Sequence, residues 1–190
     1  MTPYLILFAM VVFIAICVVC IHNSIIQRFN RVKQAWEDVL VSERQKLKIL
    51  PQLQELLKGH KSFEQSILND VTKLRTAIDS LTQSRQFATA ELAGVHEASK
   101  QLTTGLRATF EAYPDLKSSQ LYSQVMSEIS EQEDNVGAAI RIYNSNVQAH
   151  NTAIQIFPNS LINSIFTRKK AIDGFTDSAA SASIEYTPKF

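Results

Sequence analysis

Residues 4–21 read YLILFAMVVFIAICVVCI, a run of eighteen residues without a charge, a glycine or a proline. A helix of this length is about 27 Å long, which matches the hydrocarbon core of a bilayer. Twelve of the residues are Leu, Ile, Val or Phe, and together they favour insertion by roughly 4 to 7 kcal/mol. The run therefore predicts a transmembrane anchor over residues 1–21, with the lipid bilayer as the partner of residues 4–21.

A cleaved signal peptide is the competing interpretation of this run. Such a peptide has a basic segment before the apolar run and small residues at its exit. Here Met1–Pro3 contains no basic side chain, and the exit reads Cys20–Ile21–His22. These features favour a span that stays attached to the chain.

The charges beside the span predict its orientation. No Lys or Arg precedes it, whereas Arg28, Arg31 and Lys33 follow it. Since basic residues favour the cytoplasmic side, we expect a single-pass protein with its N-terminus outside and residues 22–190 in the cytoplasm.

Behind the anchor, apolar residues recur at steps of three and four, as on one face of a helix. The stripe over Leu121–Phe157 covers thirty-seven residues, which corresponds to about 55 Å of helix. Residues 22–58 form a second stretch of equal length, and helices with matched apolar stripes pack lengthwise. The sequence predicts an all-α fold, in which the anchor precedes an antiparallel up-and-down bundle of about four helices over residues 22–166.

Helix-breaking residues divide the predicted bundle. Pro51 should interrupt the first long helix, and the polar residues 82–85 should form a turn. Pro114 should end a third helix, and Pro158 should end the last. Residues 167–190 are first rich in Lys and Arg and then in Ser and Ala, which predicts a loosely ordered tail.

The composition argues against several classes of function. A net charge of +1 gives no field suited to nucleic acid. Cys17 and Cys20 both lie in the apolar run, which leaves no thiolate for a metal site elsewhere. No histidine has Glu three residues before it, and no nucleophile elbow or phosphate loop occurs. We therefore expect no enzyme, no metal and no cofactor.

Two motifs are candidates for a structural or interaction role. The first is the phrase EAYPDLK, which predicts a corner between helices; a docking corner for a partner protein is the alternative. Its candidate residues are Tyr113, Pro114, Asp115, Leu116 and Lys117.

The second motif is Tyr143, Asn144 and Asn151, at the margin of the last apolar stripe. The asparagines are seven residues apart and share one helix face. They either bond to another helix and set its register or face a partner, and we favour the first role. His150 beside them is interpreted as a hydrogen-bonded packing residue. Arg168–Lys170 supplies three charges, fewer than the four to eight typical of lipid-binding clusters, and is interpreted as solvated.

These phrases, with Ala35–Trp36 and Leu50–Leu53, resemble the LemA family of bacterial membrane proteins over roughly residues 4–166. The resemblance implies an N-terminal span in the bacterial inner membrane and a cytoplasmic antiparallel bundle. It implies no established catalytic activity. The chain departs from the family pattern at Glu43, where an apolar residue is expected, and at His150, where a second tyrosine is expected.

Two functions remain open on this basis. The first is a membrane-tethered scaffold or adaptor that binds other proteins or copies of itself. The second is a membrane sensor module that works with a separate enzyme, such as a protease or a kinase.

Overall fold

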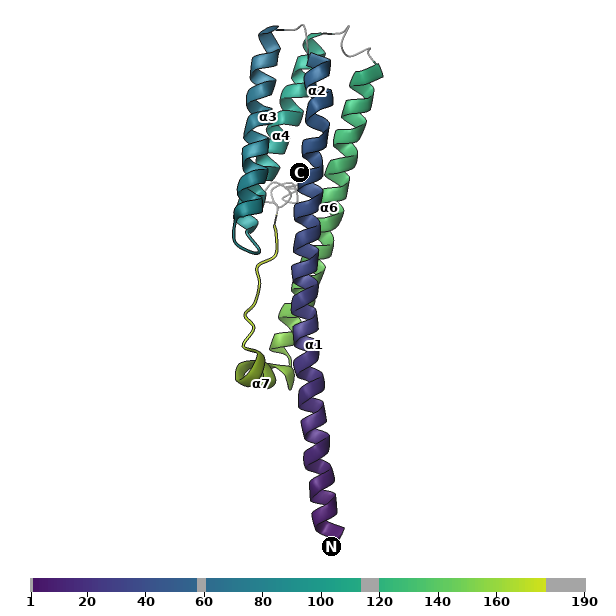
Figure 1. Cartoon of the computed structure of the whole chain (residues 1–190), viewed down its shortest axis with the longest axis vertical. Helices are drawn as coiled ribbons and strands as arrows, with labels where there is room; N and C mark the ends of the chain where they lie inside the picture. The colour runs from purple at the N-terminus through teal and green to yellow at the C-terminus, as the bar shows by residue number, and fades with distance from the viewer. Residues whose placement is uncertain (1, 58–60, 114–119, 177–190) are drawn as a thin grey trace, which may run out of the picture. The chain divides into compact units, whose positions relative to one another are not determined.

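The computed structural model describes residues 2–57, 61–113 and 120–176, and the regular structure in these ranges is helical throughout (Figure 1). This confirms the predicted all-α class. In chain order the elements are α1 (Thr2–Lys46), the 3₁₀ turn η1 (Leu47–Ile49), α2 (Leu50–Leu57), α3 (Lys61–Gln83), α4 (Thr89–Ala112), α6 (Gln120–Gln155), α7 (Asn159–Ile162) and the π-helical turn η2 (Asn163–Thr167).

The chain divides into two compact units. Unit 1 takes residues 1–35 and 142–174, and unit 2 takes residues 36–141 and 175–190. The long helices α1 and α6 each contribute to both units. The predicted limits at residues 21 and 166 stay predictions, because the division into units follows packing along these helices and not the edges of a membrane.

Unit 1 begins with the predicted span. The apolar part of α1 contains an eighteen-residue window with a mean hydropathy of 3.2, and none of that window is buried. One helix of the described residues is thus apolar enough to cross a membrane, and its surface is not covered by protein as a core helix would be. Burial starts at Ile25, which is 0% exposed. The core of unit 1 contains Ile25, Val32, Ala35, Tyr143, Val147, His150, Ala153, Ile154 and Ile162.

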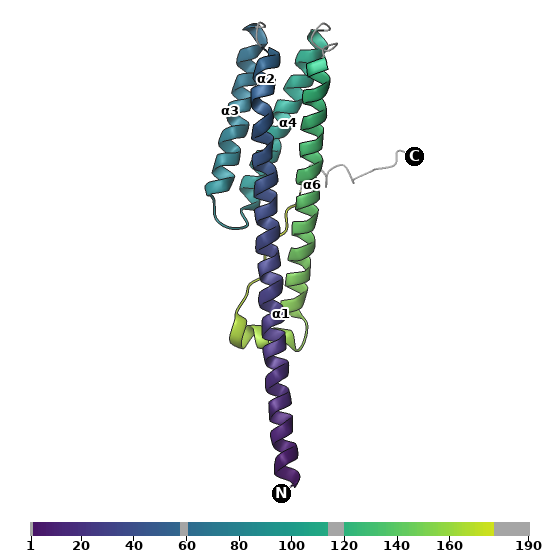
Figure 2. The ribbon, with the colours of Figure 1, turned by 45° about the vertical axis from the view of Figure 1, so that its right-hand side comes forward.

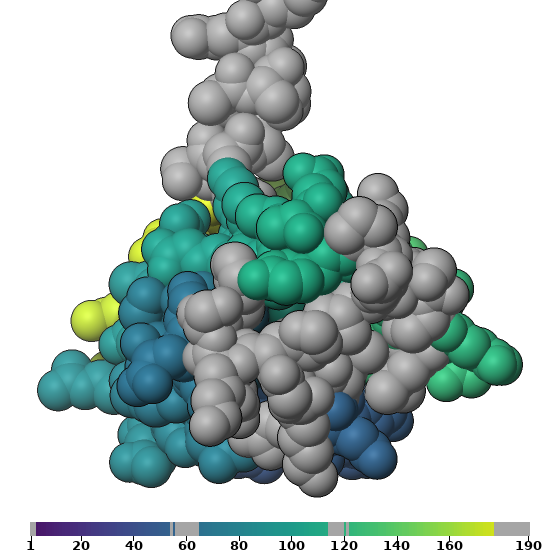
Figure 3. All heavy atoms as spheres, turned by 90° about the horizontal axis from the view of Figure 1, so that it is seen from above, coloured from purple at the N-terminus to yellow at the C-terminus, as the bar shows by residue number. Residues whose placement is uncertain are grey.

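Within the described residues, unit 2 is a bundle of four antiparallel helical segments: the end of α1 with η1 and α2, then α3, α4 and the first part of α6 (Figure 2). Its largest fully buried side chains are Trp36, Leu53, Ile67, Ile78, Leu81, Leu92, Leu106 and Phe110. At the end shown in Figure 3, the teal atoms of α4 adjoin the green atoms of α6. There the rings of Phe110 and Tyr122 lie 4.3 Å apart, centroid to centroid.

The predicted breaks lie close to the observed ones. The first long helix changes to the 3₁₀ turn η1 directly before α2, in which Pro51 is the second residue. This is the expected result, because proline offers no N–H to the preceding turn. Helix α3 ends at Gln83 inside the predicted turn. The connection to α4 includes Phe87 at φ 64°, whose ring contacts Trp36 edge-on at 6.2 Å between centroids.

Part of the C-terminal segment differs from the loosely ordered tail that the sequence predicted. Residues 168–176 have no regular structure, yet side chains of α6 bond to their backbone, and Phe175 is buried. The prediction was based on amino-acid composition only. Composition does not indicate that the backbone of this segment forms hydrogen bonds with side chains of α6. Residues 177–190 lie outside the described residues.

We predict opposite effects for two changes in α4. Gly94 lies within the helix, and a Cβ added there would meet nothing within 4 Å. Gly94→Ala should therefore raise the free energy of unfolding by about 0.5–1 kcal/mol. Leu106→Ala should lower it by about 2–5 kcal/mol, because Leu106 is fully buried. Urea unfolding of the detergent-solubilised chain, followed by circular dichroism, measures both; an equal loss in the two variants would contradict this packing.

Candidate functional site

Three side chains of α6 hold an extended segment of unit 1, and we call this set the α6 clasp: Tyr143, His150 and Asn151. The Tyr143 hydroxyl donates to the carbonyl of Asp173 at 3.0 Å. The Asn151 amide makes two bonds to Ile172, donating to its carbonyl at 2.8 Å and accepting from its N–H at 2.9 Å. Asn151 thus replaces the backbone partner that a neighbouring strand would supply. The clasp explains why residues 170–173 have a defined path without regular structure.

His150 completes the clasp from a fully buried position. Its Nε2 lies 3.2 Å from the carbonyl of Lys170. Because a carbonyl only accepts, Nε2 carries the proton and the neutral ring leaves Nδ1 bare. Buried Nδ1 has no hydrogen-bond partner in the described structure. This supports the interpretation of His150 as a hydrogen-bonded packing residue.

Burial changes the acid–base behaviour of the clasp. It raises the pKa of Tyr143 to about 12, with help from the nearby Asp173 carboxylate. Burial also lowers the pKa of His150, and the charge of Lys169 lowers it further, against the opposing effect of the Lys170 carbonyl. Both side chains are therefore neutral at physiological pH and suit a structural role.

Phe29 of α1 meets the same segment from the other side. Its ring lies 5.6 Å from the His150 ring, centroid to centroid. The Lys169 Nζ lies 3.9 Å from the centre of the Phe29 ring, within the range of a cation–π interaction. The turn after η2 is thus fixed to α1 as well as to α6.

The sequence-predicted residues Tyr143, Asn144 and Asn151 converge on one segment. A Cβ at Gly174 would lie 3.1 Å from the Asn144 Oδ1, so a larger residue at position 174 would make the Asn144 amide move by a few tenths of an ångström. The prediction that both asparagines bond to another helix needs correction for Asn151, whose observed partner is the extended backbone at Ile172. Helical periodicity located these residues but did not identify their partner.

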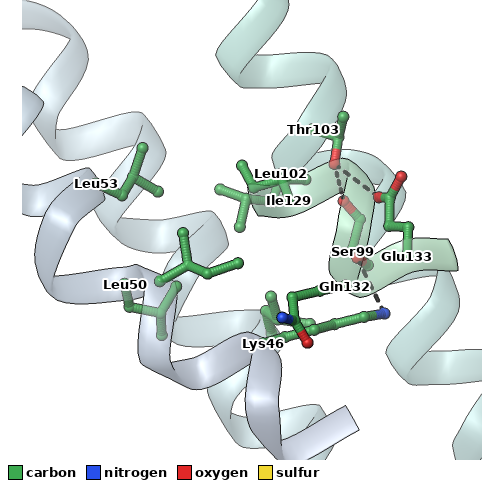
Figure 4. A pocket seen from close by; sticks show the side chains of 11 residues that line it. Lys46, Leu50, Leu53, Ser99, Leu102, Thr103, Ile129, Gln132 and Glu133 are labelled. Carbon is green, nitrogen blue, oxygen red and sulfur yellow. Dashed lines mark hydrogen bonds between the residues drawn. The ribbon is translucent and has the colours of Figure 1, made fainter. Parts of the chain in front are cut away.

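Unit 2 contains a separate buried ion pair, Glu43 and Lys46, and Figure 4 shows Lys46 with its hydrogen bond to Ser99. Glu43 is 0% exposed, and its Oε2 lies 3.0 Å from the Nζ of Lys46, which is 6% exposed. The Lys46 Nζ also donates to the Ser99 hydroxyl of α4 at 3.4 Å. Neither Glu43 oxygen has a further hydrogen-bond partner in the described structure. The pair is buried at considerable electrostatic cost, since desolvation opposes the attraction between its charges.

A polar hollow of about 420 Å³ opens beside this pair. Thr103 lies on its wall, and its hydroxyl is within hydrogen-bond distance of two acceptors, the Ser99 carbonyl at 3.0 Å and the Glu133 carboxylate of α6 at 3.2 Å. The hollow contains more positive than negative side chains and suits an acidic group better than a basic one. Its lining is Lys46, His96, Ser99, Lys100, Thr103, Thr104, Arg107, Glu133 and Gly137.

The remaining candidates give less information. Tyr113 follows the last residue of α4, where its backbone leaves the helical region at φ −127° and ψ 86°. Pro114, Asp115, Leu116 and Lys117 lie outside the described residues. Among the residues that the structure describes, no group of three or more His, Cys, Asp or Glu is placed to hold a metal ion.

The clasp predicts that Asn151 contributes more to stability than a nearby asparagine. Asn151→Ala removes both bonds to Ile172 and leaves a backbone pair unsatisfied, so the free energy of unfolding should fall by about 1–3 kcal/mol. The matched control is Asn146→Ala, whose amide donates only to Ile142 of its own helix; it should change stability by no more than about 0.5 kcal/mol. Equal losses in urea titrations would contradict the clasp.

The lowered pKa of His150 predicts a pH-dependent stability. Because the unfolded chain takes up the proton nearer the ordinary value of 6.5, the unfolded state binds more protons below that pH. His150 therefore does not reduce the free energy of unfolding above about pH 6.5. Below that pH, the free energy of unfolding falls until the pH reaches the pKa of His150 in the folded chain. His150→Gln should reduce the difference in melting temperature between about pH 7.5 and 5.5. An unchanged difference would show that other groups cause the dependence.

The buried pair predicts a non-additive double substitution. Lys46→Met leaves the Glu43 carboxylate buried without its cation, and should lower the free energy of unfolding by about 3–5 kcal/mol. The double variant Glu43→Leu, Lys46→Met removes both charges and should be close to the parent or more stable. Chemical denaturation of the parent, Lys46→Met, Glu43→Leu and the double variant measures this coupling. Additive effects would mean that the two charges do not interact.

Two comparisons with known proteins bear on this architecture. The model of the LemA family matches residues 35–185. Protein LemA of Metamycoplasma hominis is 30% identical over 135 residues, which cover 71% of this chain and 60% of that protein. The match thus spans less than two thirds of the relative's length. Since the family match covers well over half of the chain, this protein belongs to the LemA family.

Proposed function

We propose that this protein is a membrane-tethered helical scaffold or adaptor, whose bundle binds another protein or a second copy of itself. One observation carries the proposal: the single helix α1 begins as an unburied apolar segment and continues into the cores of both units. Membership of the LemA family supports a membrane-associated protein. A helix shared in this way fastens the bundle to the anchor without a linker.

The polar hollow of unit 2 is the proposed docking point for a partner. Lys100 and Arg107 are exposed at its rim, and Lys46 lies at its inner wall. Basic side chains around a concave surface attract an acidic side chain of a partner. The Glu133 carboxylate in the same lining repels an acidic side chain that lies too close to it.

The docking proposal is tested on the full chain after gentle solubilisation of membranes. The expected result is a second protein or a second copy at a fixed stoichiometry, measured by light scattering and mass spectrometry. Lys100→Gln with Arg107→Gln should weaken this complex. Lys73→Gln should not, because Lys73 is not among the residues that line this hollow and pairs with Asp70. A chain that is monomeric and alone would contradict the scaffold, and a stoichiometric protease or kinase would favour the sensor module.

We also propose that the bundle faces the cytoplasm of a bacterial cell and that the N-terminus lies outside. Arg28, Arg31 and Lys33 follow the span, and basic residues beside a span favour the cytoplasmic side. A fluorescent reporter fused to the C-terminus should therefore fold and emit light. Alkaline phosphatase fused at the same place should stay inactive. The reverse pair of results would place the bundle on the other side of the membrane.

A further inference from the structure

Unit 1 has an unusual apolar surface beyond the span itself. Seven large hydrophobic side chains outside residues 4–21 are exposed among the residues that the structure describes, and five of them fall between residues 156 and 166. Phe157 is the most exposed, at 81%. We call this group the foot; it consists of Ile156, Phe157, Leu161, Ile165 and Phe166. A group of exposed apolar side chains is unfavourable in water and marks a surface that contacts another protein, a ligand or a membrane.

The foot lies where the span ends. Phe29 of α1 is opposite His150 of α6 in an antiparallel pair. Ile156 is six residues after His150, directly past the end of α6, and Asn23 is six residues before Phe29 on α1, two residues after the apolar run. Arg28 also lines one hollow with Ile156 and Asn159. Figures 1 and 2 both show α7 beside α1 above the purple apolar end. The exposed apolar side chains of the foot therefore begin at about the level of α1 where the apolar run ends.

The charges of the chain are divided between the units. Unit 1 holds six basic residues and one acidic residue, Asp173, for a net charge of +5, whereas the rest of the chain holds 13 basic and 17 acidic residues, for −4. These values sum to the +1 of the whole chain. Six Lys or Arg residues lie within the four to eight typical of segments that bind anionic lipid. They are Arg28, Arg31, Lys33, Arg168, Lys169 and Lys170.

We propose that the foot docks on the surface of a bilayer that contains anionic lipid. Its apolar side chains enter the boundary between headgroups and acyl chains, as the apolar face of an interfacial helix does. Arg168 and Lys170, both exposed directly after η2, bind lipid phosphates, together with Arg28 and Arg31 of α1. The proposal rests on the membrane tether proposed above. The bilayer is favoured over a protein partner because the foot adjoins the span and carries its positive charge in the same unit.

A tryptophan in the foot tests this docking in the full chain. Phe157→Trp is reconstituted in bilayers with brominated lipid and phosphatidylglycerol, and its emission is compared with that of the parent, whose single tryptophan, Trp36, is buried in unit 2. Bromine should quench the added emission. The control is Ile142→Trp, which is exposed in unit 1 but lies fourteen residues from Ile156 on α6, or about 21 Å, and should not be quenched.

The possible results distinguish a failure of the proposed membrane tether from a failure of the proposed docking of the foot. Release of the protein by alkaline carbonate would overturn the tether, and with it this proposal. A retained protein with equal quenching at the two sites would overturn the foot alone. Blue-shifted emission at position 157 without quenching would assign the foot to a protein contact instead.

The charges are tested in the same way. Replacing phosphatidylglycerol with phosphatidylcholine should reduce quenching at position 157. Arg168→Gln with Lys170→Gln should lower the ratio of inserted to free foot by about fivefold for each charge removed. The matched control is Lys73→Gln with Arg75→Gln, which removes two exposed charges from unit 2. An unchanged response to phosphatidylglycerol in the foot variant would overturn the role of lipid phosphates.

Discussion

One helix must satisfy two different surroundings, and the rest of the structure depends on how α1 does so. Lipid requires apolar side chains on every side, because nothing in a hydrocarbon core can solvate a charge. A helical bundle requires an apolar stripe on one side and polar residues on the other. Helix α1 changes from the first pattern to the second between Ile21 and Ile25, without a break in its backbone. Both units take part of their core from the helix after this change.

Local periodicity made most of the fold predictable. Helices are stabilised by contacts three and four residues apart, so their stripes are visible in a single sequence. The breaks near Pro51 and after Gln155 follow from the chemistry of proline, which is equally local. The clasp could not be predicted from the sequence in the same way, because Asn151 bonds to the backbone of Ile172 and not to a side chain. A backbone carbonyl is the same in every residue, and the composition of residues 167–190 indicated only a loose tail.

The burial of Glu43 in unit 2 could not be predicted from the sequence pattern. Glu43 continues the stripe of Trp36 and Val39, and the family resemblance led us to expect an apolar residue at this position. A Glu–Lys pair three residues apart usually lies on a helix surface, where it contributes little. In the fold the same pair is buried and reaches Ser99 of another helix. Such a pair tends to fix which helices are neighbours more than it adds stability, and only the tertiary structure distinguishes the two cases.

The basic character of unit 1 arises from residues that are far apart in sequence. Arg28 and Arg168 are separated by 140 positions. Each of the two stretches of sequence around them contains only three basic residues. The antiparallel pairing of α1 with α6 collects them in one unit, beside the end of the apolar run. The LemA family match begins at residue 35, after the span. Attachment to a membrane therefore depends on the chemistry of residues 4–21, and the charge and apolar surface of unit 1 extend that chemistry to a second part of the chain.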